Sequence, residues 1–124
     1  MLTVIHLYPP HHLGGYEVAC QSVMERFAER GIEVEVLTAD HRMDGVEEVT
    51  SPVRVHRRLR GWWDWDAWAP ARLNFRERLA VERHNQRAMA ETLAGFQPDV
   101  ASVWDLGMMS WSLAVRRTQV SRFS

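Results

Sequence analysis

Hydrophobic and polar positions along the first third of the chain predict a strand, a helix and a second strand. Residues 2–7 form a short apolar run rich in β-branched side chains, as in a buried strand, and a turn follows at residues 11–15. Gly31 suits the end of a helix, and residues 32–37 resume an extended pattern. Between the strands, apolar side chains recur at helical spacing. The predicted helix face consists of Tyr16, Ala19, Val23 and Phe27, with Cys20, Met24 and Ala28 alongside.

The middle of the chain carries a weaker strand pattern and an unusual aromatic segment. After a polar loop at residues 39–51, apolar and basic side chains alternate as in a half-exposed or edge strand. The apolar positions are Val53, Val55 and Leu59, and the basic cluster Arg54, Arg57, Arg58 and Arg60 is interpreted as a solvated strand face. Residues 61–70, GWWDWDAWAP, hold four of the six tryptophans. They show neither strand nor helix periodicity, so we expect this segment to leave the sheet.

The last third of the chain repeats the helix and strand pattern. Residues 72–96 predict a long surface helix, which Pro98 ends. A short buried strand is predicted at residues 100–104 and a last helix at residues 108–117. The apolar face of the long helix is predicted from Phe75, Leu79, Met89, Ala90, Leu93 and Phe96.

This order of elements predicts an α/β fold. A strand, a helix and a second strand within 38 residues favour a right-handed βαβ unit with two parallel strands. We therefore expect a Rossmann-like, three-layer α/β/α domain with a mainly parallel sheet. The 124 residues suffice for one domain. Because doubly wound domains usually have about six strands and only three or four are predicted, we expect an incomplete domain.

Charge and cysteine content narrow the classes of partner and compartment. The formal net charge of −1 gives no general attraction to nucleic acid or to anionic membranes. The single cysteine, Cys20, allows no internal disulfide and no cysteine-based metal cluster, which favours a reducing cytoplasm. No apolar run reaches the roughly 18–20 residues that span a bilayer. We expect a soluble cytoplasmic protein, with peripheral membrane contact left open.

The first candidate site is the loop after the first strand, because ligands of open α/β sheets bind beyond the carboxyl ends of the strands. Gly14 and Gly15 let backbone N–H groups approach a ligand closely, beside the positive end of a helix. The alternative is that both glycines only make a tight turn. The loop is neither a dinucleotide fingerprint nor a P-loop. His11 and His12 have no evident third ligand nearby, so we interpret them as polar loop residues.

The second candidate site follows the strand at residues 100–104. Trp104 and Asp105 stand at its carboxyl end, so this loop and the first are expected to share a crevice. In the alternative interpretation Asp105 caps the next helix, and Trp104 completes the core.

Together the two loops resemble a known family pattern. Residues 9–17 read PPHHLGGYE, residues 30–38 read RGIEVEVLT and residues 97–105 read QPDVASVWD. This order resembles the start of glycosyltransferase family 4, enzymes of the GT-B fold, over roughly the first and last thirds of the chain. Ser102 and Trp104 stand where the family has two histidines.

The resemblance implies that residues 1–124 are a partial amino-terminal domain whose donor-binding partner domain lies outside this chain. The full enzyme would transfer a sugar with retention of configuration from a nucleotide sugar, held mostly by that second domain, to a sugar or lipid-linked acceptor. No metal or other cofactor is implied, and the chain alone is expected to be inactive. The expected substrate-binding residues are Gly14, Gly15, Glu17, Trp104 and Asp105, and no catalytic residue is assigned.

The tryptophan segment leaves a second class of function open. Its rings could stack on sugars, contact a lipid-linked acceptor or lie at a membrane interface. Asp64 and Asp66 argue against an anionic membrane surface, and a packed insertion is the preferred interpretation. The rival function is a noncatalytic α/β binding domain that recruits a partner through residues 61–70.

Overall fold

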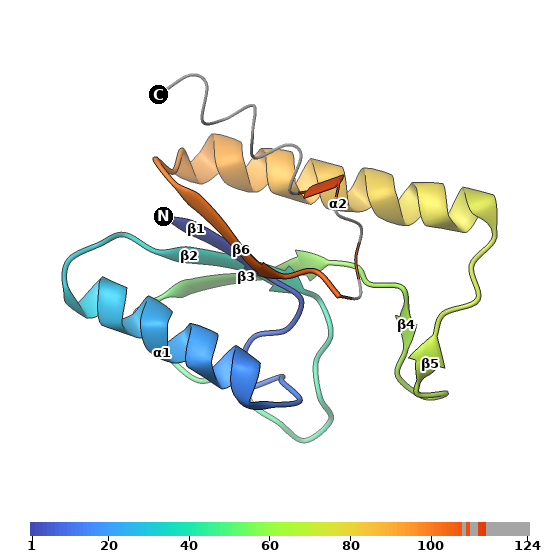
Figure 1. The fold of residues 1–124 in the computed structure, drawn as a ribbon, viewed down its shortest axis with the longest axis horizontal. Coiled ribbons are helices and arrows are strands. Elements are labelled where there is room, and N and C mark those ends of the chain that lie inside the picture. The colour runs from blue at the N-terminus through green and yellow to red at the C-terminus, as the bar shows by residue number, and fades with distance from the viewer. Residues whose placement is uncertain (108, 110–111, 114–124) are drawn as a thin grey trace.

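A computed structural model describes residues 1–107, 109, 112 and 113, and it contains a four-stranded sheet, a two-stranded sheet and two helices. Figure 1 shows their arrangement. The helix predicted over residues 108–117 falls mostly outside the described positions. In chain order the elements are β1 (Leu2–Ile5), α1 (Gly15–Glu29), β2 (Glu35–Ala39), β3 (Arg54–Leu59), β4 (Trp63–Asp64), β5 (Ala69–Pro70), α2 (Phe75–Phe96) and β6 (Ala101–Asp105).

The larger sheet is parallel throughout and confirms the predicted α/β class. Its strands follow the order β3-β2-β1-β6, so β1 lies between β2 and β6. Leu2 at the start of β1 pairs with Glu35 on one side and with Ala101 on the other. All the carboxyl ends of these strands therefore lie at one edge of the sheet.

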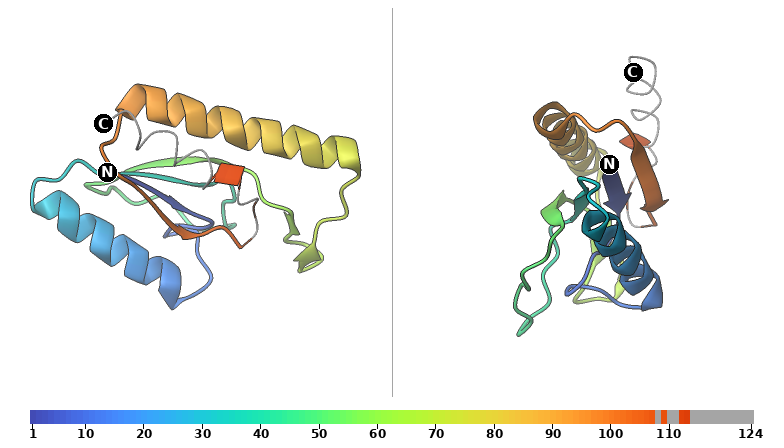
Figure 2. Two further views of the ribbon diagram at one scale, coloured as in Figure 1. Left: turned by 45° about the horizontal axis from the view of Figure 1, so that its top comes forward. Right: turned by 90° about the vertical axis from the view of Figure 1, so that its left-hand side faces the viewer.

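Alternate residues of the strands supply two hydrophobic clusters on opposite faces of the sheet. One cluster joins Leu2, Val4 and Leu37 to Ala88 and Met89 of α2. The other joins Ile5 and Val36 to Cys20 and Met24 of α1. Figures 1 and 2 accordingly show α1 and α2 on opposite sides of the sheet. Each fully buried aliphatic side chain contributes about 1.5–3 kcal/mol, so these clusters hold the helices to the sheet.

The buried face of α1 differs from the predicted one. Tyr16 and Val23 are exposed, whereas Glu17, Cys20 and Met24 are buried. The prediction was right for Cys20 and Met24 and wrong for Tyr16 and Val23, because it assigned the face by hydrophobicity, whereas the helix turns the carboxylate of Glu17 inward. Burial raises the pKa of the Cys20 thiol to about 12, which leaves it unreactive. Gly31 follows the helix at φ 85°, as its predicted place at the helix end requires.

The long helix α2 also differs in part from its predicted face. Its first turns extend past the sheet, and Phe75 and Leu79 are exposed. The buried stretch comes later and includes the polar residue Asn85, whose side chain donates to the backbone oxygen of Arg60 and accepts from its N–H, both at 2.8 Å. This amide therefore joins α2 to the end of β3. At the start of the helix, Asn74 accepts a hydrogen bond from the N–H of Glu77.

The tryptophan segment leaves the sheet, as predicted. It forms the short antiparallel hairpin β4–β5 between β3 and α2. The rings of Trp63 and Trp65 each make an edge contact with Trp68, at 6.0 and 5.9 Å between ring centroids. In the described part of the chain, no helix is long and apolar enough to cross a membrane.

Candidate functional site at the carboxyl edge of the sheet

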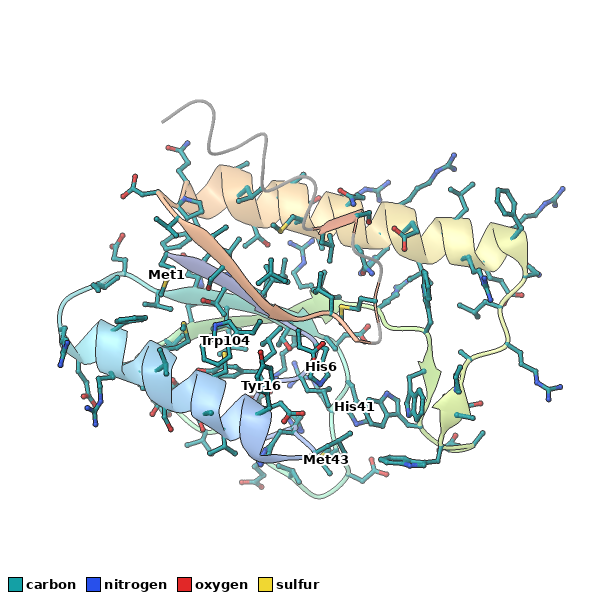
Figure 3. All side chains as sticks on the ribbon, in the orientation of Figure 1. Met1, His6, Tyr16, His41, Met43 and Trp104 are labelled. Carbon is teal, nitrogen blue, oxygen red and sulfur yellow. The ribbon has the colours of Figure 1, made fainter. Side chains whose placement is uncertain are left out.

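The loops after β1 and β6 lie side by side, as the two sequence motifs predicted. The strands are parallel neighbours, and the N–H of His6 donates to the backbone oxygen of Asp105 at 2.9 Å. The hydroxyl of Tyr16, in the first turn of α1, donates to the backbone oxygen of Trp104 at 2.8 Å. Figure 3 shows His6, Tyr16 and Trp104 close together between α1 and the end of the sheet. The two loops thus form one continuous surface.

Gly14 and Gly15 lie at the start of α1, where a Cβ on Gly14 would be 3.7 Å from Oε2 of Glu17 and one on Gly15 would lie in open space. Gly14 precedes the helix in an extended conformation, at φ −151°. Among the described glycines only Gly31 and Gly45 have positive φ, so the turn does not need glycine for its backbone conformation. A Cβ atom on Gly15 would meet nothing within 4 Å. The missing side chains instead leave the first turn of the helix, with its unpaired N–H groups, open to a ligand.

His6 lies between two carboxylates beneath these loops. Its Nε2 is 3.3 Å from Oε1 of Glu17, and its Nδ1 is 3.5 Å from Oδ2 of Asp105. The imidazole and the Glu17 side chain are buried, with 10% and 5% of their surface exposed. The Nδ1 atom is buried and makes no hydrogen bond. The ring therefore packs between the carboxylates of α1 and β6 and leaves one polar atom without a partner.

The two acidic residues predicted to bind substrate differ in their access to a ligand. Glu17 faces His6 from inside the fold, so it supports the loop and is covered. The Asp105 side chain is 43% exposed, and its Oδ1 accepts a hydrogen bond from the N–H of Gly107 at 2.8 Å. That bond closes a local turn, and the helix that Asp105 would cap in the alternative interpretation lies mostly outside the described residues. The remaining exposed surface of its carboxylate is still available for a ligand hydroxyl.

Trp104, the remaining predicted contact residue, is half-buried on β6. Its ring lies 5.6 Å from the ring of Tyr16, measured between centroids, and it packs beside the α1 cluster. The side chain therefore serves the packing role of the alternative interpretation, while its backbone oxygen ties the two loops together.

His11 supports the loop that follows β2. It is 1% exposed, and its Nδ1 accepts a hydrogen bond from the N–H of Met43 at 2.9 Å. Its Nε2 lies 3.2 Å from Oε1 of Glu48. His12 makes a local contact of 3.2 Å from Nδ1 to the oxygen of Pro10. Within the described residues, no group of three or more His, Cys, Asp and Glu side chains could hold a metal ion.

The interpretation of the basic cluster as a solvated strand face is wrong for Arg57. Its side chain is only 4% exposed and donates to the backbone oxygens of Tyr8 and Pro9, each at 2.9 Å, and to Glu48. Burial raises the pKa of the Glu48 carboxyl, but the hydrogen bond and charge of Arg57 outweigh this, and the pKa is lowered overall. Alternation with apolar residues could not reveal this role, because the partners are backbone oxygens of a distant loop.

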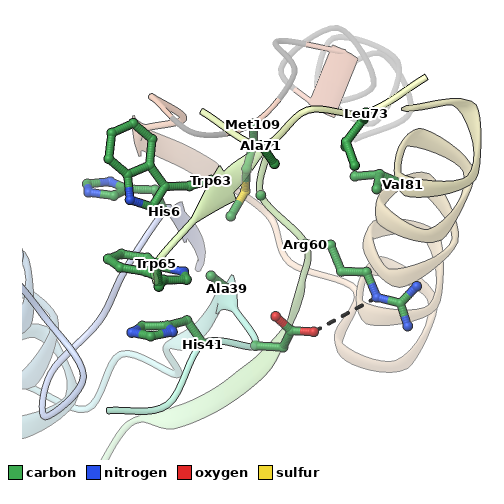
Figure 4. Close-up of a pocket in the computed structure, with 12 residues that line it drawn as sticks. His6, Ala39, His41, Arg60, Trp63, Trp65, Ala71, Leu73, Val81 and Met109 are labelled. Atoms are coloured by element: carbon green, nitrogen blue, oxygen red, sulfur yellow. Dashed lines mark ion pairs between the residues drawn. The ribbon is translucent and has the colours of Figure 1, made fainter. Parts of the chain in front are cut away.

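A cavity of about 330 Å³ adjoins His6 at the carboxyl edge of the sheet (Figure 4). His6, Asp40 and Arg60, which directly follow β1, β2 and β3, line it. The tryptophan hairpin contributes Trp63 and Trp65, and Figure 4 shows His6 beside Trp63 and Arg60 across from them. The sequence predicted the excursion but not its return over the strand ends.

His6 is a candidate site residue that the sequence analysis did not single out. It is the first residue after β1, so the rule that placed Gly14 and Asp105 at the ligand edge applies to it equally. The apolar run of residues 2–7 predicts a single strand, which places His6 inside that strand. In the structure β1 ends at Ile5, so His6 follows the strand.

Comparison with protein-family models, with curated proteins and with solved structures finds no match. The site is therefore interpreted from its own geometry.

Proposed function

We propose that this chain forms the acceptor side of the cleft of a retaining glycosyltransferase that uses a nucleotide sugar. In this proposal it is a Rossmann-like three-layer domain of the GT-B kind, and a second domain holds most of the donor. The observation that carries the proposal is the meeting of the two loops: the hydroxyl of Tyr16 bonds to the oxygen of Trp104, and His6 lies between Glu17 and Asp105.

The chemistry of sugar transfer gives each part of this edge a role. The bond from the anomeric carbon to the diphosphate breaks, and that carbon forms a bond to an acceptor oxygen whose proton is released. Negative charge therefore grows on the leaving diphosphate. The uncapped first turn of α1, at Gly14 and Gly15, offers backbone N–H donors to this charge. Loss of one such donor costs about 2.7–4 kcal/mol in comparable oxyanion sites.

The acidic residues of the edge fit the acceptor better than the diphosphate. Glu17 would repel an incoming diphosphate, but its side chain is turned inward against His6 and only 5% of it is exposed. Asp105 presents a half-exposed carboxylate that can accept a hydrogen bond from a sugar hydroxyl. The proposal therefore assigns the donor diphosphate to the glycine turn and an acceptor hydroxyl to Asp105.

Isothermal titration of the full-length protein with UDP-, GDP- and ADP-sugars tests the proposal. We expect one class of donor to bind, and the substitution Gly15→Trp to abolish binding by filling the open space before α1. Gly95→Trp is the matched control. Gly95 also has nothing within 4 Å of its Cβ position, and it lies at the opposite end of the sheet, beside Gly31 and Arg54. If no nucleotide sugar binds, or if both variants bind equally well, the proposal is wrong.

The exposed hairpin supports the rival function, a noncatalytic domain that recruits a partner. Trp68 is 61% exposed, which is unusual for so large an apolar ring. Under this rival no nucleotide sugar binds, and Gly15→Trp has no functional effect. The same titration therefore distinguishes the two functions.

A further inference from the structure

The cavity beside the tryptophan hairpin has one aromatic wall and one aliphatic wall. Figure 4 shows Trp63, Trp65 and His41 one above another on one side, and Leu73 and Val81 across from them. His41 and Trp65 stack with 3.9 Å between ring centroids and 11° between ring planes. A space between an aromatic and an aliphatic wall suits a ring that presents C–H groups, because aromatic faces carry partial negative charge.

The polar groups of the cavity suit a neutral ligand with hydroxyls. Asp40 and Arg60 line it, and their side chains are each about half exposed. The Nε of Arg60 is 3.9 Å from Oδ2 of Asp40, which is too long for a hydrogen bond. The carboxylate can accept hydrogen bonds, and the guanidinium can donate them. Because the two charges are opposite, the pair favours a neutral molecule that both donates and accepts.

The position of the cavity links it to the proposed transfer. His6 lines the cavity and also contacts Glu17 and Asp105. A ligand in the cavity would therefore lie next to the edge where the loops after β1 and β6 meet. At about 330 Å³ the cavity is at the small end of the usual range for ligand sites, roughly 300–1,000 Å³, so it has room for a single ring.

We infer that the cavity between the β4–β5 hairpin and the carboxyl ends of β1, β2 and β3 binds one neutral pyranose ring. The indoles of Trp63 and Trp65 contact the C–H groups of the ring, and Asp40 and Arg60 bind its hydroxyls. The ring is the acceptor of the proposed transfer, and to that extent the inference rests on the proposed function.

Titration with methyl pyranosides of glucose, mannose, galactose and N-acetylglucosamine tests this inference, with no nucleotide sugar present. Indole N–H resonances of the full chain report the position of binding. We expect the Trp63 and Trp65 resonances to shift with at least one probe, and the Trp104 resonance to stay unchanged. Asp40→Asn should weaken binding by about tenfold, as expected when a hydrogen bond to a charged group is lost.

The controls distinguish a sugar site from an apolar or misfolded one. Asp66→Asn makes the same chemical change on the exposed part of the hairpin, outside the cavity lining, and should leave the dissociation constant within about twofold of the parent value. Leu73→Trp fills the cavity from the opposite wall and should abolish the shifts. Binding of cyclohexanol with equal or greater affinity would show an apolar site and overturn the inference, as would failure of all four pyranosides.

The two proposals fail separately. Pyranoside binding without nucleotide-sugar binding would support the sugar site and contradict the proposed transferase function. Nucleotide-sugar binding without pyranoside binding would support the transferase function and contradict this sugar site.

Discussion

Arg57 connects β3 to the loop after β1 and to the loop that contains Glu48. Its side chain is buried, and its guanidinium satisfies two backbone oxygens, those of Tyr8 and Pro9. A buried polar group that loses its partner costs about 1–3 kcal/mol. The position of the Gly14–Gly15 turn therefore depends in part on a residue of another strand.

The substitution Arg57→Met tests this role. We expect the free energy of unfolding to fall by about 2–4 kcal/mol, because two backbone oxygens lose their donor while the apolar stem is kept. Urea denaturation measures the change. Arg54→Met, at an exposed position of the same strand, should change stability by less than about 0.5 kcal/mol. Equal effects of the two substitutions would contradict the assigned role.

Glu48 gives the same network a dependence on pH. Its pKa is lower in the folded protein than in the unfolded chain, so the ionised carboxylate stabilises the fold. This contribution is fully present above the unfolded value of about 4.3 and is lost as the pH falls through the folded pKa. Glu48→Gln should therefore destabilise the protein most at pH 7. A series of urea denaturations should show the difference from the parent shrinking below about pH 4, and a constant difference would contradict the assignment.

At the scale of elements, Asn85 fixes α2 to the end of β3. Its substitution by Ala removes both hydrogen bonds to the backbone of Arg60. We expect a loss of about 2–3 kcal/mol in unfolding free energy and faster hydrogen exchange at the Arg60 amide. Arg83→Ala, on an exposed position of the same helix, is the control and should leave both measurements nearly unchanged. An unchanged exchange rate in the Asn85 variant would show that this amide has another source of protection.

The elements themselves could be predicted from the sequence where local chemistry determines them. Apolar runs identified β1 and β6, and the positive φ at Gly31 marks the predicted end of α1. Hydrophobicity predicted Cys20 and Met24 on the inward face of α1 but not Glu17, because the Glu17 side chain turns toward His6, which follows another element.

The candidate site was predictable to a similar extent. The sheet rule brought the loops of Gly14 and Asp105 together, and the structure places them side by side. The cavity depends on how the β4–β5 hairpin folds back over the strand ends. That packing involves contacts between distant residues, such as the stacking of His41 on Trp65, which no local pattern encodes.

For the whole molecule, the sheet order β3-β2-β1-β6 gathers the functional candidates at one edge. His6, Asp40 and Arg60 directly follow β1, β2 and β3, and Asp105 is the last residue of β6. They lie at the same edge because all four strands are parallel. The opposite edge, near Gly31 and Gly95, carries none of these groups, and Gly95→Trp is therefore a suitable control.

The most direct test of sugar transfer is the release of nucleoside diphosphate from a nucleotide sugar by the full-length protein, with the methyl pyranosides supplied as acceptors of the sugar. We expect release with the donor class that binds, and Gly95→Trp should release it at the parent rate. Gly15→Trp should release no detectable diphosphate, because its side chain fills the space that the donor is proposed to occupy and the variant is expected not to bind it. A protein that binds nucleotide sugars but releases no diphosphate, or a Gly15→Trp variant that releases it as fast as the parent, would contradict the account.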